Sequence, residues 1–277
     1  ACKDWLTNKV DRSVTGKIAK QQTTGEIQLP LNNLGVVAID FKGEAGIATA
    51  LGHAPINALI SPKNGSKMAI AESLTNIVWA PFKDGLKSVS LSANWMWPCK
   101  NEGEDARLYE AVEAVSDFAC NLGINIPTGK DSLSMVQKYK DDAVYAPGTV
   151  IISASGEVSD VKKVVEPTLV NDEETSLIVV DFSRCKMELG GSSFSQVINK
   201  LGEVSPTICD DAYFARAFNA IQKLINQGLV LAGHDVSAGG LITTLLEMNF
   251  PNKKGGVNIN FSSFEEKDLM KILFSEI

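Results

Sequence analysis

The stretch Ser66–Ala80, SKMAIAESLTNIVWA, places two polar groups inside a segment that otherwise has the composition of a buried helix. Glu72 and Asn76 are four residues apart, so on a helix they lie on the same face, one turn above the other. The residues around them are apolar: Met68, Ala69, Ala71, Leu74, Ile77, Val78 and Trp79. An ionised carboxylate in such surroundings costs several kcal/mol unless a cation or hydrogen-bond donors meet it. Glu72 therefore needs a partner from elsewhere in the chain.

Two interpretations of this pair stay open on the residues alone. Oxygen ligands from glutamate and asparagine suit a hard cation such as Mg²⁺, which takes one or two protein groups together with phosphate oxygens. Alternatively, Glu72 faces water or a lysine and is a structural ion-pair partner, which is the commoner role for a single pair of this kind. The functional hypothesis is a metal site at Glu72 and Asn76.

Composition bounds the class of protein. The 277 residues are 44% hydrophobic and 21% charged, which is ordinary for a globular protein and excludes a disordered or fibrous chain. A net charge of −7 and a pI near 5.0 argue against a basic surface for nucleic acid, so small molecules are the expected partners. No apolar run approaches 18 residues, so we expect no contact with a membrane.

Cysteine usage predicts a compartment. The five cysteines are an odd number without a CxxC pair: Cys2, Cys99, Cys120, Cys185 and Cys209. This pattern indicates neither a disulfide framework nor a zinc knuckle, and it favours a reducing cytoplasm. The first residue is not methionine and the last residues, LMKILFSEI, are apolar and helix-like, so we expect a fragment of a longer protein.

Apolar runs and amphipathic stretches alternate along the chain. Strands are expected over 34–41, 89–93, 149–158, 176–182 and 229–233, and helices over 104–122, 194–201, 210–227 and 241–248. Residues 43–52 are expected to form a loop that runs into a short helix, and 160–174 a linker. The alternation predicts an α/β or α+β protein with two domains, 1–166 and 167–277.

The stretch GHDVSAGG, residues 233–240, is a second candidate site. A predicted strand delivers Asp235 and Ser237 at its carboxyl end, and two glycines then open a helix. Open α/β sheets bind ligands at such places. The alternative is that Asp235 only caps the helix, because aspartate is a preferred N-cap.

Two catalytic motifs are excluded. Residues 126–135, IPTGKDSLSM, resemble a phosphate loop, but Gly123 and Gly129 enclose five residues and Asp131 follows Lys130, so the G-x4-G-K-[ST] pattern is absent. The sequence holds two histidines, each beside a glycine or proline turn, which is too few to compose a nucleophile site.

Seven stretches in order resemble one family: DRSVTG (11–16), AESLTN (71–76), LSANWM (91–96), GEDARLYEAV (103–112), GKDSLSM (129–135), LGGSSF (189–194) and GHDVSAGG (233–240). The combination is similar to phosphoribosylformylglycinamidine synthases of the large, single-chain type. The resemblance implies the second of two tandem repeats of the ATP-binding fold shared with aminoimidazole ribonucleotide synthetase. It comprises an N-terminal half-domain with a mostly antiparallel sheet and helices, and an incomplete C-terminal α/β half-domain.

The resemblance also implies an activity. Such a ligase of purine biosynthesis, a glutamine amidotransferase, converts formylglycinamide ribonucleotide to the amidine with ATP and glutamine-derived ammonia, by phosphorylating the amide oxygen and displacing phosphate with ammonia. The first repeat and the glutaminase are then the partner domains, and the fragment by itself is expected to be inactive and to self-associate. Two alternatives remain: a catalytically silent, nucleotide-filled structural module, and a small-molecule kinase of the same fold.

The family's auxiliary site for Mg²⁺ and ATP or ADP carries over residue by residue. The implied metal ligands are Glu72, Asn76, Asp235 and Asn33, and the implied nucleotide contacts are Asn32, Ser237 and Lys3. Asn33 stands where the family usually has a metal-binding aspartate. An amide there removes one charge from a cluster that holds cations, which bears on the number of metals bound. No catalytic residue is assigned.

Overall fold

A six-stranded sheet in the order β1-β4-β5-β10-β6-β7 organises the first half of the chain in the computed structural model, which describes residues 16–277. Its strands are β1 Ile18–Lys20, β4 Leu34–Ala38, β5 Gly46–Gly52, β6 Val89–Met96, β7 Asn125–Ser132 and β10 Thr149–Val158. Every neighbouring pair is antiparallel except β6 with β7. Two small antiparallel ribbons add β2 Thr23–Thr24 with β3 Leu29–Pro30, and β8 Val136–Lys138 with β9 Ala143–Tyr145. The mostly antiparallel sheet confirms the expected fold class.

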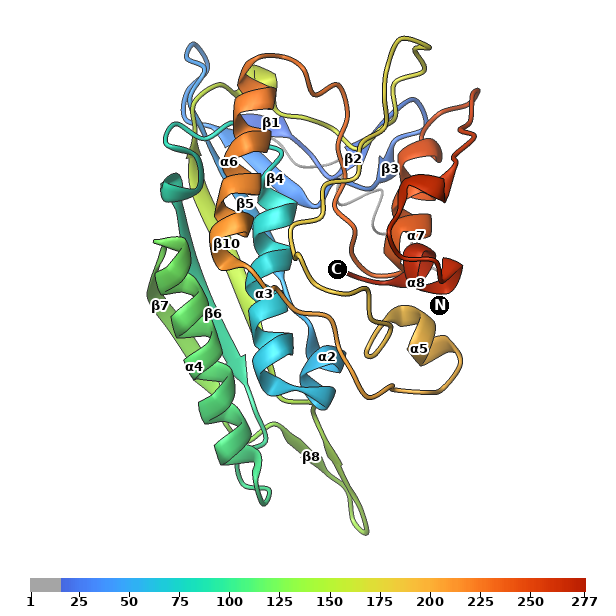
Figure 1. Cartoon of the computed structure of the whole chain (residues 1–277). Helices are drawn as coiled ribbons and strands as arrows, with labels where there is room; N and C mark the ends of the chain where they lie inside the picture. Colours follow the sequence, from blue (N-terminus) through green and yellow to red (C-terminus); the bar gives the residue numbers. More distant parts are fainter. Residues whose placement is uncertain (1–15) are drawn as a thin grey trace.

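Helices cover one face of this sheet. Figure 1 shows α3, α4 and α6 in front of the sheet, and α5, α7 and α8 to one side of it. The helices are α2 Pro55–Ile60, α3 Pro62–Ile77, α4 Glu104–Leu122, α5 Ser193–Val197, α6 Asp211–Asn226, α7 Gly240–Asn249 and α8 Leu269–Phe274. Short 3₁₀ turns lie at Gly85–Ser88, Val161–Lys163 and Phe261–Ser263. None of the helices formed by residues 16–277 combines the length and the apolar character needed to cross a bilayer.

The two helices that build the core begin and end where the sequence signals them. The side chain of Ser61 accepts a hydrogen bond from the backbone N–H of Asn64 and Pro62 follows it, so α3 starts with a capped turn. Helix α4 ends at Gly123, whose φ of 70° is left-handed and suits glycine. Strand β10 and helix α4 have the predicted bounds, 149–158 and 104–122.

The main hydrophobic core joins both halves of the chain. Phe214 and Phe218 of α6 are fully buried in one cluster with the residues of α3, α4 and the sheet. A second, smaller cluster holds Leu241, Leu245 and Ile272 of α7 and α8. Helix α6 follows the expected boundary near residue 166 but packs on the first half, and the division into two domains stays a prediction.

Three local predictions are wrong. Residues 46–52 form strand β5 instead of a loop and short helix, because Gly46, Ala48 and Ala50 alternate under the helices and Gly52 lies against α3, where a Cβ would come within 2.2 Å of the Ala69 carbonyl. Residues 176–182 and 229–233 are not strands. Their β-branched side chains have high strand propensity, but a strand needs a pairing partner, and Ile178 is instead 75% exposed.

The interpretation of the cysteines is also corrected. Cys185 and Cys209 form a disulfide with 5.4 Å between their Cα atoms. They are 24 residues apart and belong to no CxxC motif, so only the fold shows that they meet. Among the described residues, Cys99 and Cys120 are free thiols.

Candidate functional site

Helix α3 directs Glu72 and Asn76 toward the end of strand β5. The Nδ2 atom of Asn76 donates to the carbonyl of Leu51 at 2.8 Å, and an Oε2 oxygen of Glu72 accepts from the backbone N–H of His53 at 3.3 Å. The amide bond to Leu51 fixes the Asn76 side chain, whose Oδ1 atom is buried without a partner. Glu72 and Asn76 thus lie on one face of α3, as their spacing predicts, and their role as metal ligands stays a prediction.

Asp235 lies in the turn that precedes helix α7. Its Oδ1 atom accepts a hydrogen bond from Nδ2 of Asn33 at 2.9 Å and lies 3.1 Å from Nδ1 of His234. The hydroxyl of Thr244 donates to the carbonyl of Asp235 at 2.9 Å and fixes its backbone. The Oδ2 atom is buried, and no hydrogen-bond partner for it is found within residues 16–277. One carboxylate oxygen is thus held by donors while the other stays available.

The structure excludes the alternative role of Asp235 as a helix cap. The N-cap of α7 is Gly239, with φ at 94°, and no side chain caps that end. Asp235 is four residues upstream, and its carboxylate turns to Asn33 and His234 instead. The carboxylate of Asp235 is therefore directed at these two side chains and not at the first turn of α7.

The surroundings of Glu72 are acidic. Burial first of all, together with the charges of Asp235 and Glu276, raises the pKa of Glu72 to about 7 against the opposing effect of His53. None of the ion pairs formed among residues 16–277 includes Glu72. A lysine partner is therefore absent from this part of the chain, and Glu72 instead lines the cavity.

His234 lies between two carboxylates. Its Nε2 atom is 3.0 Å from Oε2 of Glu247, and Nδ1 faces Asp235. Burial acts to lower the pKa of His234, but the hydrogen bonds to Asp235 and Glu247 outweigh it and raise the pKa to about 9. For Asp235, burial acts to raise the pKa, but the hydrogen bonds from His234 and Asn33 hold it below its usual value. At neutral pH the pair is an imidazolium and a carboxylate.

A cavity of about 1660 Å³ opens over these groups. It lies between α3, α7 and the extended residues 171–182. Its polar lining includes Glu72, Asp235, Ser237 and Glu276, while Met68, Trp79 and Leu241 contribute apolar walls. Ligand sites for small molecules are commonly about 300–1,000 Å³, so this cavity has room for a nucleotide.

The remaining predicted site residues are placed differently. Ser237 lines the cavity. The Nδ2 atom of Asn32 donates to the carbonyl of Gln21 at 2.7 Å, which turns its amide toward the N-terminal strands, and its Oδ1 atom is buried without a partner. Lys3 lies outside the described residues. The site in this structure therefore centres on Glu72, Asn76 and Asp235, with Asn33 behind Asp235.

Glu276 joins the site although the sequence does not indicate it. One of its oxygens, Oε1, accepts the backbone N–H groups of Ser193 and Gly239, both at 2.7 Å. This carboxylate links the first turn of α5 to the start of α7. The glycine and serine motifs at 189–194 and 233–240 are visible in the sequence, but nothing near Glu276 marks it as their common acceptor.

The donor set suits a hard cation. Glu72 and Asp235 both line the cavity, and within residues 16–277 Oδ2 of Asp235 and Oδ1 of Asn76 are buried without hydrogen-bond partners. Oxygen donors of this kind are what Mg²⁺ takes. Within residues 16–277 no three His, Cys, Asp or Glu side chains are grouped as a metal site, so an ion here would also need the Asn76 amide and oxygens from its ligand.

Family models match nearly the whole chain. Residues 2–157 match the FGAR-AT PurM_N-like domain, and residues 176–277 match the C-terminal domain of AIR synthase related proteins. A probable phosphoribosylformylglycinamidine synthase from Arabidopsis thaliana, named as chloroplastic/mitochondrial, is 42% identical over 275 residues, 99% of this chain and 19% of that protein. The phosphoribosylformylglycinamidine synthase of Homo sapiens is 41% identical over 277 residues, 100% of this chain and 20% of that protein. The chain thus spans about a fifth of these relatives.

Solved structures share the fold at low identity. Thermotoga maritima PurL complexed with FGAR has a TM-score of 0.54 at 17% identity, over 78% of this chain and 33% of that chain. The same protein complexed with ADP has a TM-score of 0.53 at 16% identity, over 88% of this chain and 33% of that chain. The sheet, its helices and the cavity at their edge define a protein of the AIR synthase-like class. Within that class, the chain belongs to the phosphoribosylformylglycinamidine synthase family.

Proposed function

We propose that the cavity beside α3 binds ADP or ATP together with Mg²⁺. Glu72, Asn76 and Asp235 would hold the ion, and Ser237 would contact the nucleotide. The observation that carries this proposal is Oδ2 of Asp235, a buried carboxylate oxygen without a partner beside a second carboxylate whose pKa is raised to about 7. Two anions this close repel each other, and a cation between them removes the repulsion.

The chain prepares this site before any ligand enters. Asn33 and His234 both bond Oδ1 of Asp235, so the side chain cannot rotate and Oδ2 stays directed at the ligand. The protonated His234 offsets one negative charge, and Glu247 orients its ring from the other side. Mg²⁺, when bound, supplies positive charge that offsets the phosphate oxygens of the nucleotide. Because Asn33 is an amide and not a carboxylate, the site has one negative charge fewer to offset cations, which favours binding of fewer metal ions.

For the whole protein we propose the activity named in its relatives. It would be an ATP-dependent C–N ligase that aminates formylglycinamide ribonucleotide with glutamine as the amido donor. Ribonucleotide and nucleotide would be its substrates, and the remaining domains of the longer relatives its partners. The support is identity of about 40% across the whole chain with phosphoribosylformylglycinamidine synthases and a fold shared with PurL. We place the protein in the cytoplasm, which requires the Cys185–Cys209 bond to be reversible.

Calorimetric titration of ADP tests the site. We expect ADP to bind in the presence of Mg²⁺ and to lose its affinity in EDTA. Asp235→Asn keeps the shape and removes the charge, so it should abolish Mg²⁺-dependent binding, whereas Asp117→Asn on the exposed face of α4 should bind like the unmodified chain. Binding that survives in EDTA or in Asp235→Asn contradicts the proposed metal site.

The same preparation separates the two remaining functional alternatives. Incubation with ATP and Mg²⁺, followed by chromatography of the nucleotides, should leave ATP intact if the site is a structural module. Steady release of ADP without any acceptor molecule would show turnover in this part of the chain. Phosphorylation of an added small molecule would favour a kinase instead.

We also propose that the chain self-associates through the outer face of its sheet. Val37 and Ile47 are paired across β4 and β5 and both are exposed, and Leu51 on the same strand is 60% exposed. An open apolar sheet face is a common contact surface. Sedimentation velocity should show a dimer that Leu51→Lys dissociates, while Tyr109→Lys on α4 leaves it intact. A monomer at tens of micromolar, about the range in which weak interfaces act, contradicts this proposal.

A further inference from the structure

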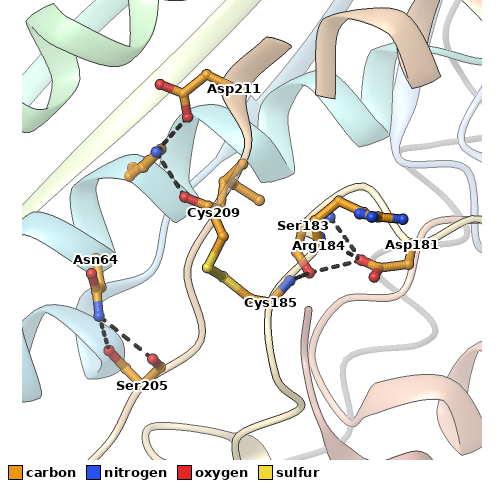
Figure 2. Close-up of a disulfide and its surroundings, with 10 residues drawn as sticks. Asn64, Asp181, Ser183, Arg184, Cys185, Ser205, Cys209 and Asp211 are labelled. Carbon is orange, nitrogen blue, oxygen red and sulfur yellow. Dashed lines mark hydrogen bonds and ion pairs between the residues drawn. A yellow bond between two sulfur atoms is a disulfide. The ribbon is translucent and has the colours of Figure 1, made fainter. Parts of the chain in front are cut away.

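The Cys185–Cys209 disulfide joins two segments that meet only in the fold. Figure 2 shows Cys185 at the end of the turn that contains Asp181 and Ser183, and Cys209 on the segment that leads to Asp211 and helix α6. The N–H of Cys209 donates to the carbonyl of Ser183 at 2.8 Å beside the bond. Cys209 is exposed and Cys185 is half-buried, so Cys209 is the more accessible partner of the bond.

The disulfide anchors one wall of the cavity. Residues 171–182 line the cavity, and in the described part of the chain no backbone hydrogen bond holds residues 176–182. The contacts that secure the end of this wall are few. Phe182 packs on Phe214 with 5.1 Å between ring centroids, Ser183 accepts from Cys209, and Arg184 lies over Tyr213. The covalent bond is the strongest of these anchors.

The other side of the bond is tied to the helix that carries Glu72. The Nδ2 atom of Asn64 donates to Oγ of Ser205 at 3.2 Å, and the ammonium of Lys67 donates to the carbonyl of Ile208 at 2.8 Å. Asn64 and Lys67 both belong to α3. The disulfide therefore connects the unpaired cavity wall to the helix of the proposed metal site.

The disulfide also closes the loop of residues 185–209, in which Gly191 and Ser193 line the cavity. Within it, Gly190 donates to Val204 at 3.1 Å and Gly191 to Leu201 at 2.8 Å. Ser193, in the same loop, donates its N–H to Glu276 at 2.7 Å. Opening the ring would release the wall at one end of this loop and loosen the contact between Ser193 and Glu276.

We propose that Cys185–Cys209 is a thiol-exchange site, and that its reduction by a dithiol loosens the cavity wall and weakens nucleotide binding. The effect on binding rests on the proposed nucleotide site, whereas the exchange reaction does not. Disulfides in a reducing compartment are usually transient or redox-sensing, so a reversible bond also reconciles this pair with a cytoplasmic protein.

The exchange is a balanced two-electron step. A thiolate of the dithiol attacks Sγ of Cys209, the S–S bond breaks, and Cys185 leaves as a thiolate that takes a proton from water. The second thiol of the donor, as thiolate, then attacks the mixed disulfide and releases Cys209, which is protonated in turn. The dithiol becomes a disulfide, so it loses the two electrons that the protein gains.

The test compares ADP binding by the oxidised chain and by the chain reduced with dithiothreitol, both with Mg²⁺. We expect the reduced chain to bind about fivefold more weakly, at the lower end of ordinary coupling between sites. By linkage, saturating ADP should then lower the midpoint potential of the disulfide by about 21 mV. The double variant Cys185→Ser/Cys209→Ser should bind ADP as weakly as the reduced chain. Dithiothreitol should not change this affinity, although the variant keeps Cys99 and Cys120.

Two further measurements keep the outcomes distinct. Mass spectrometry after alkylation should show Cys185 and Cys209 protected only in the oxidised chain, and hydrogen exchange over residues 188–208 should quicken on reduction. Equal ADP affinity in both redox forms, unchanged exchange, or two freely alkylated cysteines before reduction each overturn the proposal. If ADP binds neither form, the proposed nucleotide site fails and the claim on binding with it, while faster exchange over residues 188–208 still shows that reduction loosens the loop that the disulfide closes.

Discussion

Replacing Glu72 with glutamine tests the site at its most perturbed group. The pKa of Glu72 rises from 4.5 to about 7 in the folded chain, chiefly through burial. A carboxyl group whose pKa is raised in the folded state does not affect stability below its unfolded pKa. As the pH rises from the unfolded to the folded pKa, the group destabilises the fold progressively. The shift corresponds to about 3 kcal/mol above pH 7. Because glutamine remains polar and buried, we expect Glu72→Gln to stabilise the empty chain by about 1–2 kcal/mol at pH 8 and to change little at pH 4.5.

The ligand response of the same variant should move in the opposite direction. For the unmodified chain, ADP at about 100 times its Kd adds about 2.7 kcal/mol when Mg²⁺ is present. For a chain of this size that is a rise in Tm of roughly 5–10 °C. Glu72→Gln removes a metal ligand, so the ADP response should disappear although the empty variant melts at a higher temperature.

Differential scanning calorimetry with and without ADP and Mg²⁺ measures both effects. The matched control is Glu113→Gln on α4, which removes the carboxylate of an exposed ion pair with Lys63 of α3 and should change stability by less than about 1 kcal/mol. An unchanged ADP response in Glu72→Gln refutes the site. A loss of about 3 kcal/mol in the empty variant would instead show that Glu72 neutralises a buried cation.

Three further changes follow from the same geometry. Asn33→Asp removes the donor to Asp235 and adds a carboxylate, so it should destabilise the empty chain yet tighten Mg²⁺-dependent ADP binding in calorimetry. Burial lowers the pKa of Lys20 from 10.5 to about 8, so its charge destabilises the fold most below pH 8, and this cost disappears as the pH rises to 10.5. Lys20→Met should therefore stabilise the fold by about 2–3 kcal/mol at pH 7, a gain that urea titrations find lost near pH 10.5. Gly52→Ala would press a Cβ to 2.2 Å from the Ala69 carbonyl, so urea titration should show a loss of at least about 2 kcal/mol.

Local patterns determined much of the first half of the chain. The apolar stripe of residues 104–122 predicted helix α4, and the β-branched run of 149–158 predicted strand β10, both with the correct first and last residues. Such predictions succeed because the helix and strand periods can be recognised within one segment. The spacing of Glu72 and Asn76 likewise placed both on one face of α3. Helix geometry alone sufficed for that inference. Strand β5 was missed because its glycines match close approaches of other segments that no local pattern shows: Gly52 lies against α3, and a Cβ on Gly46 would meet Val161.

Only the tertiary structure decided how the site is completed. Asn33 meets Asp235 across 202 residues of sequence, and Ser193 meets Glu276 across 83. The contact with Asn33 decides which carboxylate oxygen of Asp235 is held and which is left for a ligand. Cys185 and Cys209 pair for the same reason, although their spacing carries no signal. Periodicity fixes the face on which a side chain lies, but its partners across the chain depend on how distant segments pack, and that information is not local.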